Sequence, residues 1–357
     1  PLADLREGLK SVTYQKVLGS LWDKCMRVAE LARVTANRVG VDAGLAAHAA
    51  SLCKCDLLTR MVGEFPELQG VMGRYYAAAH GEPAELAEAL DAFYQPRQAG
   101  DPVAAGKLGQ VLAVAERLDT LAGIFAVGQK PTGTRDPFAL RRAALGLART
   151  LIEGGLDIAL EPAFIEALDL LPAIAGATDK PGLAGELYDF VLDRLRGYYA
   201  EQGLAVEAFE AVLAVRPASL SDFDRRLRAV AAFAALPEAA SLAAANKRVG
   251  NLLRKQDAIA SRTVDPRLFD ADAERALAAA LQAARAETDR AMDAGDYAGA
   301  LARLAALQAP VDRFFDEVLV MAEDAGVRGN RLALLAELQA RFLAIADIAR
   351  LQAVDNC

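Results

Sequence analysis

The sequence has few residues that bind metal ions or form disulfides: among its 357 residues are only two histidines and four cysteines. These residues are His48, His80, Cys25, Cys53, Cys55 and Cys357. Four cysteines in a chain of this length do not make a disulfide framework, so we expect free thiols. A zinc site needs about four ligands, usually in two close pairs, and the single Cys-Lys-Cys pair has no mate. We therefore expect no metal, and Cys53 and Cys55 to be small, buried or half-buried helix residues.

Aromatic residues are also scarce, at 6% of a sequence that is 54% hydrophobic. Alanine and leucine are abundant, whereas isoleucine and threonine, which favour strands, are few. This composition favours helix over sheet. The sequence therefore predicts an all-α protein built as several helical bundles, because the chain is long enough for two or three domains.

No run of about 18 apolar residues is present, and no basic-then-apolar leader opens the sequence. We expect a cytoplasmic protein with no membrane partner. The chain begins at Pro1 inside a charged, helix-forming stretch, which is typical of the rear part of a longer polypeptide. The net charge is −8, from 40 basic and 48 acidic residues. A polyanionic partner must therefore be bound by local basic patches.

Apolar residues recur at helical spacing in three segments of the first half of the chain, at 18–39, 43–62 and 107–127. A looser stretch rich in proline and glycine follows, which places a boundary near residue 155. A second connector lies at Arg216 and Pro217, before a helix that Ser221 and Asp224 are spaced to cap. The sequence thus divides at 1–155, 156–217 and 218–357.

Three short segments resemble the ligand-bearing helices of the HD superfamily of metal phosphohydrolases: RVAELA (27–32), SLCKCDLLT (51–59) and VAERLDTL (114–121). In that alignment Lys24 stands at the first histidine, Cys55 at the second, Asp56 at the retained aspartate, and Glu116 at the final aspartate. One ligand of four is unchanged, and a protonated lysine cannot ligate a cation. The resemblance implies a helical scaffold whose hydrolase centre has been lost.

A longer resemblance covers nearly the whole chain. KCDLLTRMVGEFPELQGVMGRYYA, ERLDTLAGIFAVGQKPTGTRDPFALRRAALGLART, AAANKRVGNLLRK and DRFFDEVLVMAEDAGVRGNRLALLAELQARFLAIADIARLQ are similar to the C-terminal portion of the bacterial glycyl-tRNA synthetase β subunit. The resemblance implies a degenerate HD-like domain (1–155), a connector (156–217) and an anticodon-binding bundle (218–357). It also implies tRNA(Gly) and a synthetase α subunit as partners in an α₂β₂ enzyme. ATP and Mg²⁺ would serve the α subunit, with no cofactor or catalytic centre in this portion.

Turning the segment 242–255 by about 100° per residue places Leu242 and Val249 on a core face. The opposite face forms a basic stripe: Lys247, Arg248, Asn251, Arg254 and Lys255. Arginine and asparagine can contact base edges as well as phosphates, so the stripe is a candidate anticodon contact. An ordinary solvated helix face is the alternative. Arg225, Arg226 and Arg228 form a second basic cluster, which either contacts phosphates or merely solubilises its helix.

The loop GQKPTGTRDP and the helix after it bring together Lys130, Arg135, Arg141 and Arg142. The loop lacks the order of a nucleotide P-loop. We expect contact with the backbone of the tRNA acceptor arm, because the resemblance places an HD-like domain near it. The alternative is a structural turn in which Asp136 starts the helix.

Phe65, Met72, Tyr75 and Tyr76 are more typical of a core than of a base-stacking surface. Glu116 and Asp119 are three residues apart on one helix, and without a metal or a histidine partner they favour salt bridges, with Lys24 or Arg117, over acid–base chemistry.

Two other functions remain open. A working HD phosphohydrolase would hold a metal ion near Asp56. A pure assembly scaffold would join the two subunits without touching RNA.

Overall fold

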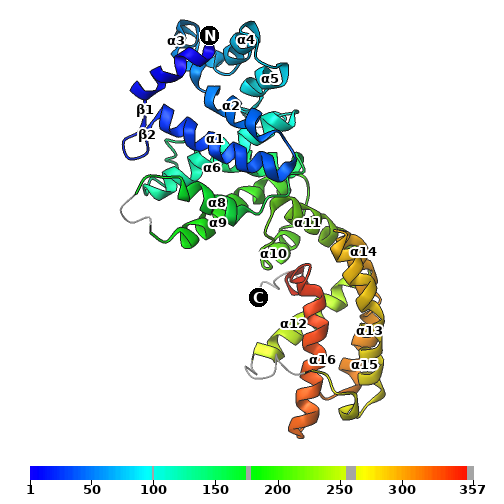
Figure 1. The fold of residues 1–357 in the computed structure, drawn as a ribbon. Helices are drawn as coiled ribbons and strands as arrows, with labels where there is room; N and C mark the ends of the chain where they lie inside the picture. Colours follow the sequence, from blue (N-terminus) through cyan, green and yellow to red (C-terminus); the bar gives the residue numbers. More distant parts are fainter. Residues whose placement is uncertain (99, 174–177, 255–262, 352–357) are drawn as a thin grey trace. The chain divides into compact units, whose positions relative to one another are not determined.

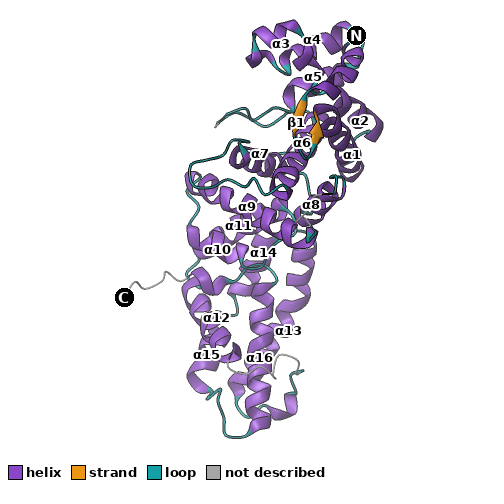
Figure 2. Ribbon diagram, turned by 90° about the vertical axis from the view of Figure 1, so that its left-hand side faces the viewer, coloured by secondary structure: helices purple, strands orange, loops and turns teal. Residues whose placement is uncertain are grey.

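The structure is a computed structural model and describes every residue except 99, 174–177, 255–262 and 352–357. Across the described residues the chain is helical, apart from one antiparallel hairpin of strands β1 (Thr13–Gln15) and β2 (Gly19–Ser20) (Figure 2). The predicted all-α class is confirmed. In the part of the chain that the structure describes, no single helix is both long and apolar enough to cross a membrane, and one helix pair bent by 112°, Leu220–Ala234 with Ala239–Arg254, passes that test by length and composition.

The chain divides into two compact units, an N-terminal unit of Pro1–Leu195 with Ala218–Ser221 and a C-terminal unit of Arg196–Pro217 with Asp222–Cys357. The sequence-based division at residues 155 and 217 stays a prediction.

The N-terminal unit contains the hairpin and a set of α- and 3₁₀-helices (Figure 1). These are η1 (Leu2–Ser11), α1 (Leu21–Val39), α2 (Ala43–Leu52), η2 (Cys55–Leu58), α3 (Arg60–Glu64), η3 (Pro66–Leu68), α4 (Val71–Ala79), α5 (Ala84–Ala92), α6 (Lys107–Ala126), α7 (Leu140–Glu153), α8 (Leu160–Asp169) and the first part of α9 (Lys180–Glu201).

Helix α1 shows how the local sequence sets these elements. Ser20 and Asp23 form a reciprocal capping box at its start, which satisfies amides that have no partner within the helix. Gly40 ends the helix in the left-handed conformation, at φ 72°, which suits a residue without a side chain. Val28 and Leu31 are buried on the face that packs against α2 and α6.

Helix α6 is the centre of the N-terminal unit. It contacts α1, α2, α5, α7 and α8, and Figure 1 shows it between α1 and α8. Apolar side chains are buried all around it, including Val111, Leu118 and Leu121. A helix enclosed on every side has little room for charge, yet Arg117 and Asp119 are also buried here, at 7% and 0% exposure.

Two sequence predictions about elements are wrong. The single helix expected over 43–62 is broken into α2, η2 and α3, because Cys53 and Lys54 form a turn and the next helical turn is 3₁₀. Ser221 does not cap α11, because that helix begins one residue earlier, at Leu220. Asp224 instead accepts hydrogen bonds from Tyr199 and Arg228.

The C-terminal unit contains the end of α9 and a bundle of further helices. These are α10 (Val206–Leu213), α11 (Leu220–Ala234, from Asp222), α12 (Ala239–Arg254), η4 (Pro266–Leu268), α13 (Asp272–Asp293), α14 (Tyr297–Ala305), α15 (Gln308–Glu317), α16 (Ala325–Leu343) and η5 (Ile348–Leu351). Both ribbon views show α13 and α16 running alongside each other. A buried ion pair joins them, with Arg331 Nε 2.9 Å from Glu274 Oε1.

The buried charges of α6 give the first testable prediction. Asp119 lies 2.6 Å from Arg27 and 2.9 Å from Lys24, so Asp119→Ala leaves two buried cations without their shared anion. We expect the free energy of unfolding of the N-terminal unit to fall by about 3–5 kcal/mol, as is typical when one member of a buried ion pair is removed. Trp22 is the only tryptophan and lies in α1, so its fluorescence during urea denaturation reports on this unit.

Glu30→Ala is the matched control, because Glu30 makes an exposed ion pair with Arg33 on the same helix. Exposed pairs contribute little to stability. An equal drop in stability for the two variants would contradict the importance of the buried pair.

Candidate functional site

The first candidate site lies where α1 meets α6. The ammonium group of Lys24 lies 2.9 Å from Asp119 Oδ2, 3.4 Å from Glu116 Oε1 and 2.7 Å from Thr120 Oγ1. Arg27 adds a second cation on Asp119. The predicted salt bridge of Lys24 with Glu116 and Asp119 is therefore confirmed. A fixed ammonium group contacts the carboxylates that would otherwise face a metal ion.

Asp56, aligned with the retained metal ligand, makes different contacts. Its Oδ2 accepts hydrogen bonds from the amides of Gly70 at 2.6 Å and Gly73 at 3.1 Å, at the start of α4. Burial raises the pKa of this carboxyl group, against the effect of those amides. Among the described residues, no ion pair or hydrogen bond joins Asp56 to Lys24 or Glu116. Asp56 thus stabilises a helix start.

The sulfur of Cys55 is buried, and it lies 3.7 Å from the carbonyl oxygen of Ser51. Cys25 and Cys53 are likewise free and buried, whereas Cys357 lies outside the described residues. Burial raises the pKa of Cys55 to about 12, which leaves its thiol protonated and a poor metal ligand. In the described part of the chain, no three histidine, cysteine or acidic side chains are grouped so that they would hold a metal ion.

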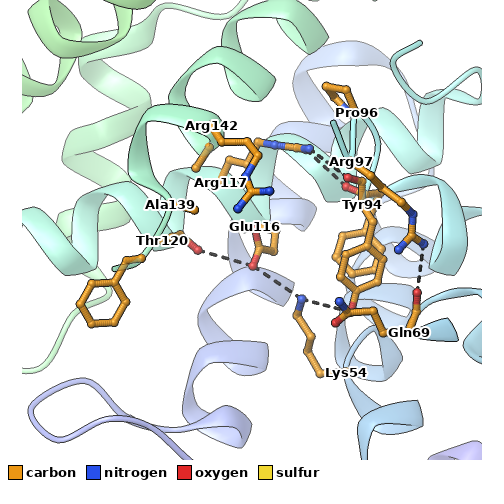
Figure 3. Close-up of a pocket in the computed structure, with 13 residues that line it drawn as sticks. Lys54, Gln69, Tyr94, Pro96, Arg97, Glu116, Arg117, Thr120, Ala139 and Arg142 are labelled. Carbon is orange, nitrogen blue, oxygen red and sulfur yellow. Dashed lines mark hydrogen bonds and ion pairs between the residues drawn. The ribbon is translucent and has the colours of Figure 1, made fainter. Parts of the chain in front are cut away.

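A pocket of about 470 Å³ opens beside Glu116 (Figure 3). Its lining residues come from α6, α7 and the segments that precede η2, α4 and α7 and follow α5. They are Lys54, Gln69, Phe93, Tyr94, Pro96, Arg97, Glu116, Arg117, Thr120, Phe138, Ala139, Arg142 and Ala143. Figure 3 shows Lys54 and Arg142 approaching the Glu116 carboxylate from either side. The pocket is therefore lined by more positive than negative side chains.

Three of these cations, Lys54, Arg97 and Arg117, form hydrogen bonds or ion pairs with other groups of the protein. Lys54 Nζ lies 3.3 Å from Tyr94 Oη and 3.7 Å from Glu116 Oε1. Arg97 donates to Gln69 O and to Asp91, each at 3.0 Å.

Arg117 donates to backbone carbonyl groups of 93, 94, 95 and 113. Gly146 of α7 passes so close that a β-carbon there would lie 2.7 Å from Arg117 Nε.

The cations keep Glu116 ionised. Burial alone would raise the pKa of this carboxyl group, but Lys24, Lys54 and Arg117 outweigh it and lower the pKa to about 2. Conversely, burial would lower the pKa of Lys54, and the neighbouring Tyr94 and Glu116 raise it above its ordinary value. The pocket wall therefore carries fixed charges at neutral pH.

The second candidate site is the basic stripe on α12. Lys247, Arg248, Asn251 and Arg254 are all exposed, while Leu242 and Val249 are fully buried. The guanidinium carbon of Arg248 lies 4.4 Å from the ring centre of Phe315 on α15, and Arg254 donates to the side-chain oxygen of Asn251. Lys255 lies outside the described residues. The predicted division of this helix into a core face and an exposed polar face is confirmed.

The loop before α7 holds the third group of predicted contacts. Asp136 accepts hydrogen bonds from the amides of Leu140 and Arg141, so it does organise the helix start. Lys130 pairs with Glu186, and Arg141 donates to Gly133 O.

Arg135 and Arg142 are exposed. Within the described residues they make no ion pair with a carboxylate.

The three arginines of the basic cluster on α11 form ion pairs and hydrogen bonds with other residues of the C-terminal unit. Arg226 donates to Asp222, to Tyr297 Oη and to the carbonyl groups of 344 and 345. Arg225 also pairs with Asp222, and Arg228 pairs with Asp224. These contacts give Arg226 a structural role. An RNA contact by Arg225 or Arg226 stays a prediction.

The core placement expected for the aromatic group is wrong for two of its members. Phe65 is 50% exposed and Tyr75 is 59% exposed, whereas Met72 and Tyr76 are half-buried. The reason is that Phe65 lies in the short link between α3 and η3, and Tyr75 is on the outer face of α4.

Sequence reasoning missed the pocket. Lys54 and Arg117 lie within segments that carry the family resemblance, but neither they nor Arg97 are predicted to line a pocket. The available signal is the group of charged residues, Glu116, Arg117 and Asp119, in the middle of a largely apolar helix.

The chain thus combines an all-α fold, a buried lysine in contact with Glu116 and Asp119, and an exposed basic face on α12. The family model for the glycyl-tRNA synthetase beta subunit matches residues 1–214, and that for the DALR anticodon binding domain matches residues 242–354. The chain belongs to the glycyl-tRNA synthetase β-subunit family.

Similar proteins share this description. The chain is 54% identical over 347 residues to a glycine–tRNA ligase beta subunit of Xanthomonas campestris, covering 96% of this chain and 50% of the relative. It is 51% identical to one from Chromohalobacter salexigens, covering 98% of this chain and 51% of the relative. A third, from Pseudomonas syringae, is 49% identical, again covering 98% of this chain and 51% of the relative. The chain thus spans about half the length of the curated relatives it matches.

The ionised Glu116 gives a prediction about pH. Its folded-state pKa of about 2 lies below the ordinary 4.5, so its stabilising contribution is complete above about pH 4.5 and disappears as the pH falls toward 2. We expect Glu116→Gln to remove this part of the acid sensitivity. The measurement is the urea midpoint of Trp22 fluorescence at pH 6, 4 and 3. Parallel pH profiles for the variant and the parent chain would refute the assignment.

Proposed function

We propose that this chain is the tRNA-binding part of the β subunit of a heterotetrameric glycine–tRNA ligase. It positions tRNA(Gly) for aminoacylation at the α subunit. The observation that carries the proposal is the exposed basic stripe of α12, which lies in the region matched by the DALR anticodon binding domain. Binding energy collected far from the reacting atoms can orient a substrate, which is a recognised source of catalysis.

The geometry of the stripe supports contact with unpaired bases. Arg248 lies against the ring of Phe315, so its guanidinium plane is held in place while the side chain remains exposed. A guanidinium plane can stack on a base, and asparagine and arginine can donate to base edges. Lys247 adds charge for the phosphates. We assign Lys247, Arg248, Asn251, Arg254 and Lys255 to the anticodon arm, and we assign Arg225 and Arg226 of α11 to tRNA contact as well.

The second proposed RNA surface is on the N-terminal unit. Arg135 and Arg142 are exposed and make no ion pair within the described residues, which leaves them available to phosphates. Lys130 and Arg141, from the same loop and helix, complete the proposed contact with the acceptor arm.

The proposal also assigns the parts of the chain. Residues 1–155 form the degenerate HD-like domain, 156–217 the connector and 218–357 the anticodon-binding bundle. The β chain works in the cytoplasm with the α subunit as its partner, without a membrane, and the α subunit uses ATP and Mg²⁺.

The stripe is tested by a triple variant, Lys247→Ala with Arg248→Ala and Arg254→Ala. We expect the affinity for tRNA(Gly) to fall at least about tenfold. The slope of log affinity against log salt should also become shallower, by up to about 0.9 for each phosphate that the variant no longer neutralises. Filter binding at several salt concentrations measures both quantities.

A matched control replaces three arginines elsewhere in the same unit, Arg275, Arg290 and Arg303, with alanine. This control removes the same number of charges and should bind tRNA nearly as well as the parent chain. If the stripe variant binds like the control while keeping its helical circular dichroism, the assembly scaffold is the better assignment.

We further propose that this chain has no catalytic centre of its own. The support is local: Lys24, aligned with one metal ligand of the HD superfamily, contacts Glu116, aligned with another, and also Asp119. The chain alone should show no glycine-dependent exchange of pyrophosphate into ATP and no phosphomonoesterase activity with added Mn²⁺. A phosphatase activity that Asp56→Ala abolishes would overturn this assignment.

A further inference from the structure

The pocket beside Glu116 has the dimensions of a small-molecule site. Its volume of about 470 Å³ falls within the range of about 300–1,000 Å³ that is usual for ligand pockets. Part of the wall is apolar and aromatic, from Phe93, Tyr94, Phe138 and Ala143. Polar groups of Gln69 and Thr120 lie in the same lining. Such a mixture suits a planar organic group that also carries hydrogen-bonding atoms.

The charge of the pocket is not balanced. Its lining holds four cationic side chains and one carboxylate, that of Glu116. Arg97 is paired with Asp91, 3.0 Å away. Among the described residues, Arg117 and Arg142 have no carboxylate within ion-pair distance.

Arg117 is the more unusual of the two, because it is only 7% exposed. Its hydrogen bonds all end on neutral carbonyl groups, which satisfy its donors but do not cancel its charge. A buried charge of this kind is costly unless an opposite charge comes near.

Glu116 offsets this excess only in part. Lys24 binds its carboxylate from outside the pocket, at 3.4 Å, and Lys54 binds it from inside, at 3.7 Å. The negative charge of Glu116 is thus already shared between two ammonium groups. Arg117 and Arg142 remain as uncompensated positive charge in a partly enclosed space, where the field of a charge is stronger than in open water.

We propose that this pocket binds a nucleoside monophosphate group, with its phosphate on the exposed guanidinium group of Arg142 and its base against the ring of Phe138. A phosphate monoester carries up to two negative charges, which matches the excess left by Arg117 and Arg142. Arg142 is exposed and has donors to spare for a phosphate oxygen. The partly enclosed shape admits one nucleotide and not a duplex.

Such a group has two sources, a free mononucleotide or the 5′-phosphorylated end of an RNA strand. The inference does not rest on the proposed tRNA-binding function, since a free nucleotide would fill the pocket without it.

Equilibrium dialysis of the 357-residue chain against AMP and against adenosine is the direct test. AMP should bind at one site per chain, and adenosine should bind at least about tenfold more weakly, because it lacks the phosphate that the cations hold. Ala143→Phe should abolish AMP binding by filling the pocket without changing its charge. Arg142→Ala should weaken binding about tenfold, the scale of one charge-assisted contact.

Arg33→Ala is the control, because Arg33 is an exposed arginine of α1 that does not line the pocket. It should bind AMP as the parent chain does. Trp22 fluorescence and circular dichroism establish that each variant is folded. If Ala143→Phe does not fold, the AMP affinity of Arg142→Ala is the test, because Arg142 is exposed and its replacement should leave the fold intact.

The source is settled with a short single-stranded RNA made with and without a 5′-phosphate. Competition with AMP by the phosphorylated form only, abolished in Ala143→Phe, assigns the pocket to an RNA end. Binding of AMP without competition assigns it to a free nucleotide. The inference is overturned if neither AMP nor the phosphorylated RNA binds, or if both bind equally well to the parent chain and to Ala143→Phe.

Discussion

The N-terminal unit depends on one buried carboxylate. Asp119 lies at 0% exposure in the central helix α6, and its two oxygens are held by Lys24 and Arg27 of α1. Without it Arg27 would lose its carboxylate partner and Lys24 would keep only Glu116, and an unpaired charge in the interior is strongly disfavoured. The arrangement fixes the register of α1 against α6. The positions of the residues that line the nearby pocket, including Glu116 and Lys54, therefore depend on that contact.

The same contact limits what this helical scaffold can bind. A lysine at the position of a metal ligand brings its own positive charge, covalently fixed, to the place where such a site would bind a cation. The neighbouring carboxylate of Glu116 is satisfied by Lys24 and Lys54. What remains is an electropositive pocket suited to binding anions.

Much of this architecture is predictable from the sequence. The all-α class, the extent of α6 and the two faces of α12 follow from composition and helical spacing, because burial imposes a period of 3.6 residues. The salt bridges of Lys24 also follow, from the absence of any metal partner.

The break at Cys53 does not follow from the sequence, because it depends on Asp56 turning toward Gly70 and Gly73, 14 and 17 residues away. Nor does the pocket, whose lining comes from two helices, α6 and α7, and from several connecting segments. Long-range pairing of this kind leaves no local pattern.

The close approach of α7 to α6 has a consequence for how this family can vary. Gly146 has no side chain, and only for that reason does Arg117 keep its place beneath it, since a β-carbon would lie 2.7 Å from Nε. Gly146 thus determines where the buried guanidinium group of Arg117 can lie, although the two residues are 29 apart in the sequence. In relatives, we expect a residue larger than glycine at position 146 to occur together with a side chain shorter than arginine at position 117.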